Sequence, residues 1–468
     1  MGTGIFILRP TWRSQRGNAL AIGFGGLLLI CAPAAPRTLS TSSDEAKARH
    51  VLVISVDGMG GQFLEQTAPH VRAPNLQRLR KEGCYAEGVV GVYPTLTYPS
   101  HTTIVTGRMP AEHGIYTNLS SREAGKNPRD WFWFASAIKV PTLWDEARTH
   151  QLTTGAVFWP VAAGAPIDWD IPEIWDPQKG EVGDPLYVAR FATPGVLFQA
   201  LLELGMPKPG TDEDITRAGL AAFVLRKYKP NLLLVHLASL DRIEHQSGPA
   251  SPEVAAGLEL EDQLIGELLA AAQETGLAEW TDVFIVSDHG FLPIENEVAP
   301  NVLLAKAGLL NLNGHGEVVS GKITTVSNGG SFFLYWPDGE DLQPVVDAAL
   351  KPIVDQGVVW GLLNRSALRD LGAEPAAQMA LEAREGWEFS SRASGEVVAK
   401  LSTTEGSHGY LPYRPALQAS FVAWGPGLRV GMNLHLIPMT AIGPTILKAM
   451  GINDPSFGAH PPLVEIFK

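Results

Sequence analysis

Six side chains of the types that bind divalent metal ions are spread along the sequence, three carboxylates and three imidazoles. They are Asp57, Asp241, His245, Asp288, His289 and His408. Asp241 and His245 are four residues apart, so on a helix over residues 240–246 they would share one face and could bind the same ion. Asp and His together suit zinc best, and manganese or iron would also be compatible. These residue types therefore predict metal chemistry.

The positions of the other candidates favour one common site. Asp288 and His289 follow an apolar run together, where a turn can direct adjacent side chains at one point. His408 lies between Gly406 and Gly409, which allow the backbone to approach closely. Each residue alone has a simpler interpretation, as a turn or helix cap, a surface pair or a loop residue. Because all of them fall where a parallel sheet would place its site, we favour a dinuclear metal site.

A candidate nucleophile lies in the segment 93–107, which reads YPTLTYPSHTTIVTG. Pro99 suits the first turn of a helix that runs toward Val105, so Thr97 is predicted at or just before a helix N-terminus. Free amides and the positive end of the helix dipole favour an anion there. An alcohol is a poor nucleophile at neutral pH, but metal coordination lowers its pKa and orients it for attack. The alternative is that Thr97 only caps the helix.

The elements that must position these residues alternate between strand and helix. Three apolar, β-rich runs each end on an acid, at residues 51–57, 232–241 and 283–288. Runs without polar alternation suit strands that are buried on both faces of a parallel sheet. Helical patterns fall at residues 141–147, 216–229 and 252–274. This order predicts an α/β fold, in which ligands bind outside the carboxyl ends of the strands.

Two segments look like additions to this sheet. Residues 119–180 are loop-like and rich in aromatic side chains, whereas residues 296–400 carry strand and helix signals of their own. We interpret residues 296–400 as an inserted α+β cap subdomain. The α/β catalytic core would then comprise residues 50–295 and 401–468.

The first 34 residues have the features of a secretory signal peptide, and residues 35–49 those of a polar linker. Three arginines precede an uncharged apolar stretch at residues 19–32, and an Ala-Pro-Ala cleavage pattern ends at residue 34. We therefore expect a secreted or periplasmic protein without stable membrane insertion. An uncleaved N-terminal helix acting as an anchor is the alternative. After cleavage Cys84 would be the only cysteine, which excludes an intrachain disulfide.

The chain is acidic, with a formal charge of -13 that becomes -16 if the three arginines of the leader are removed. Binding of extended nucleic acid requires a basic face, so the charge argues against such partners and favours a small substrate. Bound cations can still supply positive charge locally. An acidic protein can therefore carry out phosphate chemistry.

Together the motifs resemble the type I phosphodiesterase/nucleotide pyrophosphatase family of the alkaline phosphatase superfamily, over most of the chain from Val51 to Met450. The resemblance implies an alkaline-phosphatase-like core with a mostly parallel central sheet flanked by helices. It implies that Thr97, in the TYPSH motif, is the nucleophile and that Asn118, 21 residues later, holds a phosphoryl oxygen. It also implies two zinc ions and a phosphothreonine intermediate. The implied ligands are Asp241, His245 and His408 for one zinc, and Asp57, Thr97, Asp288 and His289 for the other.

The chain departs from the family pattern in two motifs. Ser100 stands where many members have asparagine, and residues 242–244 are Arg-Ile-Glu where many have Ser-Ser-Gly. Tyr98 and Trp159 are expected to contact a base or an aryl leaving group, with simple packing as the alternative. His101 is assigned a structural hydrogen-bonding role and not metal binding.

The sequence thus predicts a metal-dependent phosphoric diester hydrolase that acts on a small phosphodiester or pyrophosphate. A phosphomonoesterase or a phosphonate hydrolase on the same site is the enzymatic alternative. From another class, the chain could be a catalytically silent binding protein that metal stabilises. Sulfatase chemistry is not indicated, because the region around Thr97 lacks the C/S-x-P-x-R pattern from which formylglycine is made.

Overall fold

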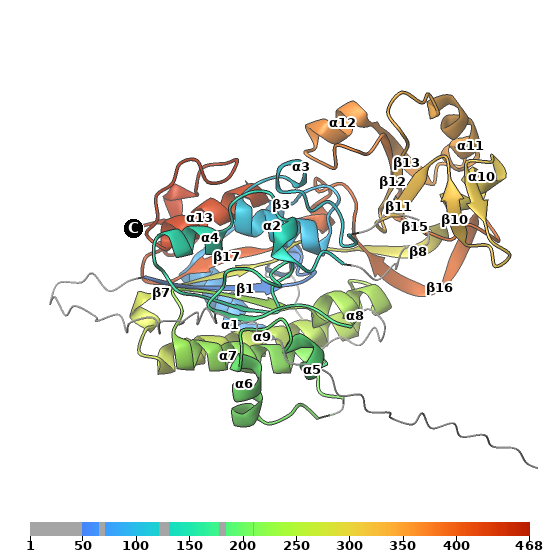
Figure 1. Ribbon diagram of the computed structural model, residues 1–468. Coiled ribbons are helices and arrows are strands. Elements are labelled where there is room, and N and C mark those ends of the chain that lie inside the picture. Colours follow the sequence, from blue (N-terminus) through green and yellow to red (C-terminus); the bar gives the residue numbers. More distant parts are fainter. Residues whose placement is uncertain (1–48, 65–70, 121–130, 177–183, 209) are drawn as a thin grey trace, which may run out of the picture. The chain divides into compact units, whose positions relative to one another are not determined.

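An eight-stranded sheet forms the centre of the computed structural model, which describes residues 49–64, 71–120, 131–176, 184–208 and 210–468. In order across the sheet, the strands are β18 (Met432–Asn433), β2 (Cys84–Tyr85), β17 (Phe421–Trp424), β7 (Thr281–Val286), β1 (His50–Val56), β6 (Leu232–Leu237), β4 (Thr154–Val157) and β5 (Trp169–Ile171) (Figure 1). Residues 47–468 form one compact unit. The predicted signal peptide, residues 1–34, and the predicted linker up to residue 48 lie outside the described residues.

The sheet is mostly parallel, as the sequence predicts. Five of its seven neighbouring strand pairs are parallel, and the two antiparallel pairs both involve β17. The central strands β1, β6 and β7 are buried along almost their whole length. Their apolar runs therefore reflect strands covered by helices on both faces.

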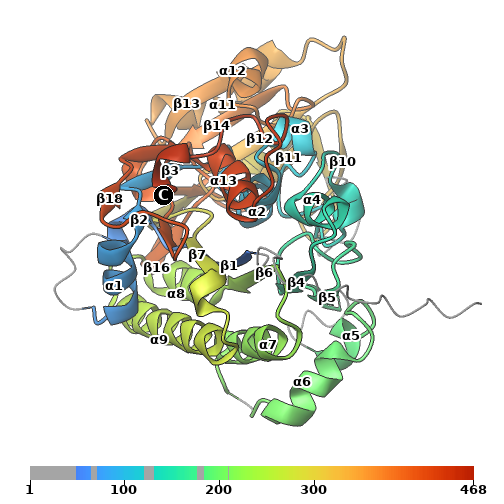
Figure 2. The ribbon, with the colours of Figure 1, turned by 90° about the vertical axis from the view of Figure 1, so that its left-hand side faces the viewer.

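Alternate side chains of β1 enter two separate hydrophobic cores. Leu52 and Ile54 belong to one core, and Val51 and Val53 belong to the other. The first core is covered by α1 (Pro74–Glu82), α7 (Glu213–Tyr228) and α9 (Pro252–Glu274). The second is covered by α2 (Thr97–Thr106), α4 (Leu143–Thr149) and α13 (Ile442–Ala449). Figure 2 shows these two helical layers with the sheet between them. Each fully buried aliphatic side chain contributes about 1.5–3 kcal/mol.

A further set of sheets is built from residues 292–407, which we call the cap region (Figure 1). Its four-stranded sheet has the order β11 (Thr324–Ser327), β12 (Ser331–Tyr335), β14 (Met379–Ala383), β13 (Val359–Asn364). Its other sheets are β15 (Gly386–Phe389), β8 (Leu292–Val298), β16 (Val398–Ser407), and β10 (Val318–Gly321) with β9 (Leu310–Leu312). Its helices are α10 (Pro300–Lys306), α11 (Gln343–Asp355) and α12 (Arg365–Asp370). The paired strands β8 and β16 cross both predicted ends of the 296–400 insertion, so the cap region joins the core through strands.

The remaining elements include a helix that is important for the site. They are β3 (Gly88–Val90), β19 (Leu436–Pro438), α3 (Pro110–His113), α5 (Pro185–Val188), α6 (Val196–Leu204) and α8 (Ser239–Ser247). The structure confirms the helix considered over residues 240–246, and Asp241 lies in the first turn of α8 and not at the end of the preceding strand. The reason is that β6 ends at Leu237 and Asp214 accepts the N–H of Ser239 at 2.6 Å, which supports an immediate helix start.

Two further observations bear on the sequence predictions. Cys84 is buried and unpaired within the described part of the chain. Among the described helices, none combines the length and the apolar character needed to cross a membrane.

Candidate metal centre and nucleophile

The candidate site lies at the carboxyl edge of the central sheet. β1 pairs in parallel with both β6 and β7, so the three strands run in one direction and Val56 lies opposite Leu237. Asp57 directly follows β1, Asp288 follows β7, and α8 follows β6. The strand register therefore brings acids from three distant parts of the chain to one edge.

The outer group consists of Asp241, His245 and His408. The Nε2 atoms of the two histidines are 3.1 Å apart, and they lie 3.6 and 3.7 Å from Asp241 Oδ1. His245 Nδ1 donates to the Gly406 carbonyl at 3.0 Å, and His408 Nδ1 donates to the Thr95 carbonyl at 2.8 Å. These bonds leave a lone pair on each Nε2 atom. Two lone pairs and a carboxylate that face one another repel unless a cation lies between them.

The inner group consists of Asp57, Asp288 and His289. His289 Nε2 lies 3.2 Å from Asp288 Oδ2 and 3.4 Å from Asp57 Oδ1. These three buried atoms have no hydrogen-bond partner among the described residues, nor does Asp241 Oδ1. A carboxylate oxygen of Asp241 also lies within 4.8 Å of ligand atoms of Asp57 and His289. Asp241 therefore connects the inner group to the outer one.

The electrostatics of the inner group show an excess of negative charge. Burial raises the pKa of Asp57 well above its usual value, and the charges of Asp288 and Asp241 raise it further. Burial would also raise the pKa of Asp288, but its neighbours His289 and His101 lower it below the usual range. Buried carboxylates without compensating positive charge are costly. The orphaned atoms and the mixed carboxylate and imidazole donors fit divalent cations such as zinc.

The predicted nucleophile begins helix α2. Leu96 is the N-cap residue and makes no side-chain capping bond, so Thr97, the first residue of the helix, does not act as its cap. One turn later, His101 donates from Nδ1 to the Thr97 carbonyl at 2.8 Å and accepts at Nε2 from the Ser55 hydroxyl at 2.8 Å. Burial lowers the pKa of His101 to about 4, which keeps the ring neutral. Because Ser55 lies two residues before Asp57, His101 ties α2 to the end of β1.

Asn118 lies beside the first turn of the same helix. Its Oδ1 accepts the N–H of Tyr98 at 3.0 Å. Because the oxygen is engaged in this way, the Nδ2 group is left to donate to another acceptor. Thr97 and Asn118, which are 21 residues apart in the sequence, are therefore brought together at the N-terminus of α2.

A comparison with protein families agrees with this geometry. The family model described as type I phosphodiesterase / nucleotide pyrophosphatase matches residues 51–411. The chain belongs to this family. The phosphodiesterase family is metal-dependent, and the inner and outer groups are the candidate metal-binding residues of this member.

Curated relatives of this phosphodiesterase family member match it over different lengths. The chain is 27% identical over 259 residues to ectonucleotide pyrophosphatase/phosphodiesterase family member 1 of Rattus norvegicus, covering 53% of this chain and 24% of the relative. It thus spans about a quarter of that protein's length. It is 26% identical over 470 residues to the bis(5'-adenosyl)-triphosphatase ENPP4 of Bos taurus, covering 94% of this chain and 85% of the relative.

Solved structures share the fold. Murine ectonucleotide pyrophosphatase/phosphodiesterase 5, solved as an inactive variant in complex with AMP, superposes with a TM-score of 0.62 at 19% identity. The match covers 88% of this chain and 96% of the murine one. The human protein gives a TM-score of 0.62 at 20% identity, covering 88% of this chain and 97% of the human one. The core of this phosphodiesterase family member is therefore the alkaline-phosphatase-like α/β fold that its motifs imply.

Two residues expected to contact the substrate are buried instead. Neither Tyr98 nor Trp159 has exposed surface. The Tyr98 hydroxyl donates to Glu173 at 2.9 Å, and the Trp159 ring packs edge-on to His101 with centroids 5.0 Å apart. In this member of the phosphodiesterase family both rings therefore pack inside the core, as the packing alternative expects, and contact with a base or aryl group stays a prediction.

Three buried polar residues beside the site were not predicted, namely Glu173, His236 and Glu244. His236 is the only polar residue of β6, and a polar side chain in a strand buried on both faces needs a partner. This need for a partner is the feature of the sequence that could have indicated a role for His236. Glu244 stands where many members of the phosphodiesterase family have glycine, and neither of its oxygens has a hydrogen-bond partner among the described residues. Burial raises its pKa well above the usual value, and the charge of Asp241 adds to this effect.

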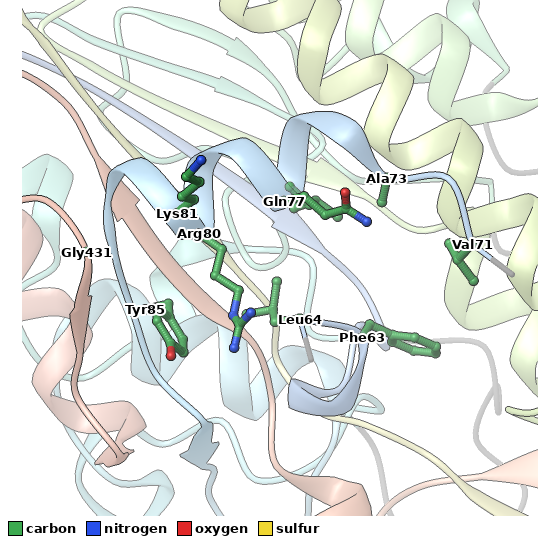
Figure 3. Close-up of a pocket in the computed structure, with 10 residues that line it drawn as sticks. Phe63, Leu64, Val71, Ala73, Gln77, Arg80, Lys81, Tyr85 and Gly431 are labelled. Atoms are coloured by element: carbon green, nitrogen blue, oxygen red, sulfur yellow. The ribbon is translucent and has the colours of Figure 1, made fainter. Parts of the chain in front are cut away.

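A cavity of about 650 Å³ lies elsewhere, beside α1 and the 3-10 turn Gly61–Leu64 (Figure 3). Its lining includes Phe63, Arg80, Lys81 and Tyr85. The described residues that line it include no member of the inner group, the outer group or the Thr97 region. We therefore do not assign this cavity to the phosphodiesterase site.

Proposed function

We propose that this chain is a two-zinc phosphodiesterase/nucleotide pyrophosphatase that hydrolyses small phosphodiesters or pyrophosphates, with Thr97 as its nucleophile. The observation that carries the proposal is the convergence of unpaired carboxylate and imidazole atoms near the N-terminus of α2. A hydroxyl at a helix N-terminus beside such donors suits an anionic ester held among cations.

The two groups divide the ligands between two ions. The outer group would hold one ion, and the inner group together with Thr97 would hold the other. Bound divalent cations lower the pKa of a hydroxyl or water and neutralise phosphoryl charge. In the outer group, the carbonyls of Gly406 and Thr95 already hold the imidazoles with Nε2 directed at the ligand position. This arrangement supports binding without rearrangement of the side chains.

The chain's own residues account for both chemical steps. Thr97 Oγ1 forms a bond to phosphorus while the bond to the leaving oxygen breaks, and the hydroxyl proton passes to the leaving oxygen or to solvent. Water then forms a new P–O bond as the bond to Oγ1 breaks, which releases the phosphate product and restores Thr97. In both steps Asn118 Nδ2 donates to a non-bridging phosphoryl oxygen, since its Oδ1 is held by Tyr98.

A nucleotide-like substrate is favoured by charge and by the relatives. The formal charge of -13 opposes the binding of extended polyanions. The bovine relative is named as a bis(5'-adenosyl)-triphosphatase, and the murine fold neighbour was solved with AMP. Both names support a substrate with a phosphate ester or anhydride joined to a nucleoside.

The test is turnover by metal-free protein reloaded with zinc. We expect hydrolysis of bis-p-nitrophenyl phosphate and diadenosine triphosphate to return with zinc and to exceed that of p-nitrophenyl phosphate. Thr97→Ala should retain zinc but lose activity by about 1,000-fold or more, as other covalent hydrolases do without their nucleophile.

Three other outcomes would change the assignment. Diester hydrolysis by Thr97→Ala at the wild-type rate would show that Thr97 is not the nucleophile. Faster turnover of the monoester, or of a phenylphosphonate ester, would favour one of the two alternative hydrolases. Zinc binding without turnover of any of these compounds would favour a metal-stabilised binding protein.

We also propose that residues 1–34 are removed during export to the periplasm or the cell exterior. The proposal rests on the arginines, the apolar stretch and the cleavage pattern of the leader. N-terminal sequencing of the protein made by its native cell should start near residue 35. A terminus at Met1 in the membrane fraction would instead support the uncleaved anchor.

A further inference from the structure

A chain of buried hydrogen bonds starts at the inner group. His236 in β6 donates from Nε2 to Asp57 Oδ2 at 3.0 Å and from Nδ1 to Glu173 Oε2 at 2.8 Å. Both ring nitrogens are therefore held, and the ring cannot rotate without breaking two bonds. The other oxygen of Asp57, Oδ1, is the one left facing His289. His236 thus determines which carboxylate oxygen is available to a cation.

The chain continues from Glu173 to the nucleophile helix. Glu173 Oε1 accepts the hydroxyl of Tyr98 at 2.9 Å. Tyr98 directly follows Thr97, and its backbone N–H donates to Asn118. One carboxylate therefore connects an inner-group ligand, through His236, to the first turn of α2. Three elements that are distant in the sequence meet in this connection.

Burial makes these bonds directional and difficult to replace. Glu173, His236 and Tyr98 are all buried, so water cannot substitute for a lost partner. Arg217 lies 3.5 Å from Glu173 Oε2 and stacks over the ring of Phe158 at 4.7 Å, which fixes the Glu173 end. The Phe158 carbonyl accepts a further bond from His236 Nδ1 at 3.2 Å. The network is therefore anchored in the core at both ends.

We propose that His236 and Glu173 are positioning residues, which align Asp57 with the inner metal position and the first turn of α2 with the scissile phosphorus. The inference rests on the proposed function, because the alignment is meaningful only for a metal-bound ester. The two residues do not touch the reacting atoms. Tyr98 completes the connection through its hydroxyl.

The first test separates the two bonds of His236. The amide of His236→Gln can reach the Nε2 position and still donate to Asp57, whereas the amide of His236→Asn can reach only the Nδ1 position near Glu173. We expect His236→Asn to lose about 10- to 100-fold in zinc affinity, as loss of an outer-shell partner does in other metal sites. His236→Gln should stay close to wild type. Zinc affinity is measured by competition with a chelating dye and does not require turnover.

The second test concerns the Tyr98 arm and has a matched control. Tyr98→Phe removes one hydroxyl, and we expect zinc affinity and KM to be kept while kcat falls by up to about 100-fold, the cost of a small misplacement. Tyr335→Phe removes a similar buried bond, from Tyr335 to Glu374 at 2.7 Å, in β12 of the cap region. It should lower the Tm to a similar extent and leave kcat unchanged.

The outcomes separate positioning from simple stability. Equal zinc affinity in folded His236→Asn and His236→Gln, or equal kcat in Tyr98→Phe and Tyr335→Phe, would overturn the inference. If His236→Asn does not fold, the Tyr98 pair decides the question. If the wild type turns over no ester, the proposed function fails, while the zinc affinities of the His236 variants still show whether the ring orients Asp57.

Discussion

The inner and outer metal-ligand groups differ in how the fold holds them. The inner side chains are 0–4% exposed and lie within three residues of the ends of strands β1 and β7. In the outer group, the His245 side chain is 43% exposed and that of Asp241 is 20% exposed, and both belong to the short helix α8. The third outer ligand, His408, directly follows β16 of the cap region. The inner group is therefore held by the central sheet, whereas the outer group combines helix α8 with the end of a cap-region strand.

This difference teaches that two adjacent ion positions can depend on different parts of one fold. A buried ligand at a strand end is held by the whole sheet, and its loss leaves an unpaired buried group. A half-exposed ligand on a helix can be replaced in part by water. The inner group should therefore be intolerant of substitution, and the outer group should respond to metal concentration.

The largest effect is expected for Asp288→Asn. The amide keeps an oxygen to accept the N–H of Gly58, at 3.2 Å in the present structure, but removes the charge from the inner group. We expect loss of zinc and a fall in diester hydrolysis of about 1,000-fold or more, because several kcal/mol of metal stabilisation are lost. Zinc content and kcat/KM measure this.

The matched control is Asp282→Asn, near the start of strand β7 and away from the carboxyl edge that Asp288 follows. Asp282 is also buried and accepts the N–H of Gly427 at 2.8 Å. This variant should lose stability and keep its zinc. If both variants keep zinc and activity, the inner group is not a metal site.

A smaller and reversible effect is expected for His245→Ala. Because this side chain is 43% exposed, water can enter the space it leaves. We expect about 10- to 100-fold lower activity at limiting zinc, with partial recovery in excess zinc. His50→Ala serves as the control, since His50 Nδ1 also donates to a backbone carbonyl, that of Pro230 at 2.8 Å, at the opposite end of β1. If excess zinc restores none of the lost activity, the proposed difference between the inner and outer groups is wrong.

The smallest effect on activity is expected at Glu382, where the cap region supports the outer group. Glu382 in β14 accepts the N–H of Leu411, three residues after His408, and forms an ion pair with Arg414, both at 2.9 Å. Burial nevertheless raises the pKa of Glu382 to about 7. The folded state thus binds a proton that the unfolded state releases above about pH 4.5, so this residue's contribution to stability falls as pH rises from 4.5 to 7.

Glu382→Gln removes this dependence. We expect wild type to lose about 3 kcal/mol relative to the variant between pH 4.5 and pH 7.5, with no further change above that range. Urea unfolding of both proteins at the two pH values measures the difference. A difference in stability that is the same at both pH values would show that Glu382 has the same charge when folded and unfolded.

The sequence predicted the features that depend on a single segment. The apolar runs identified β1, β6 and β7. The helical spacing identified α9 at residues 252–274, and the structure confirms these bounds. The proline at position 99 indicated a helix start, and α2 does begin at Thr97. Such features depend on local preference and on burial of both faces, which a run of residues encodes directly.

The features that the sequence did not indicate depend on contacts between distant segments. The hydroxyl of Tyr98 donates to Glu173, 75 residues later, in the core. The apolar run at residues 232–241 does not continue as a strand to Asp241, because a helix starts after β6 and carries Asp241 at the spacing from His245 that indicated one helix face. The partners of His236 lie 63 and 179 residues away, so no local pattern identifies them.

By itself, the sequence determined the chemistry that is available to this protein: a hydroxyl at a helix start and acids and imidazoles at the ends of buried strands. Membership of the phosphodiesterase family follows from the same motifs. Only the tertiary structure decided which donor atoms face one another, which tautomer each imidazole adopts and which aromatic rings are buried. The physical reason is that residue type and spacing encode local structure, whereas burial and hydrogen-bond partners depend on packing between segments that are distant in the chain.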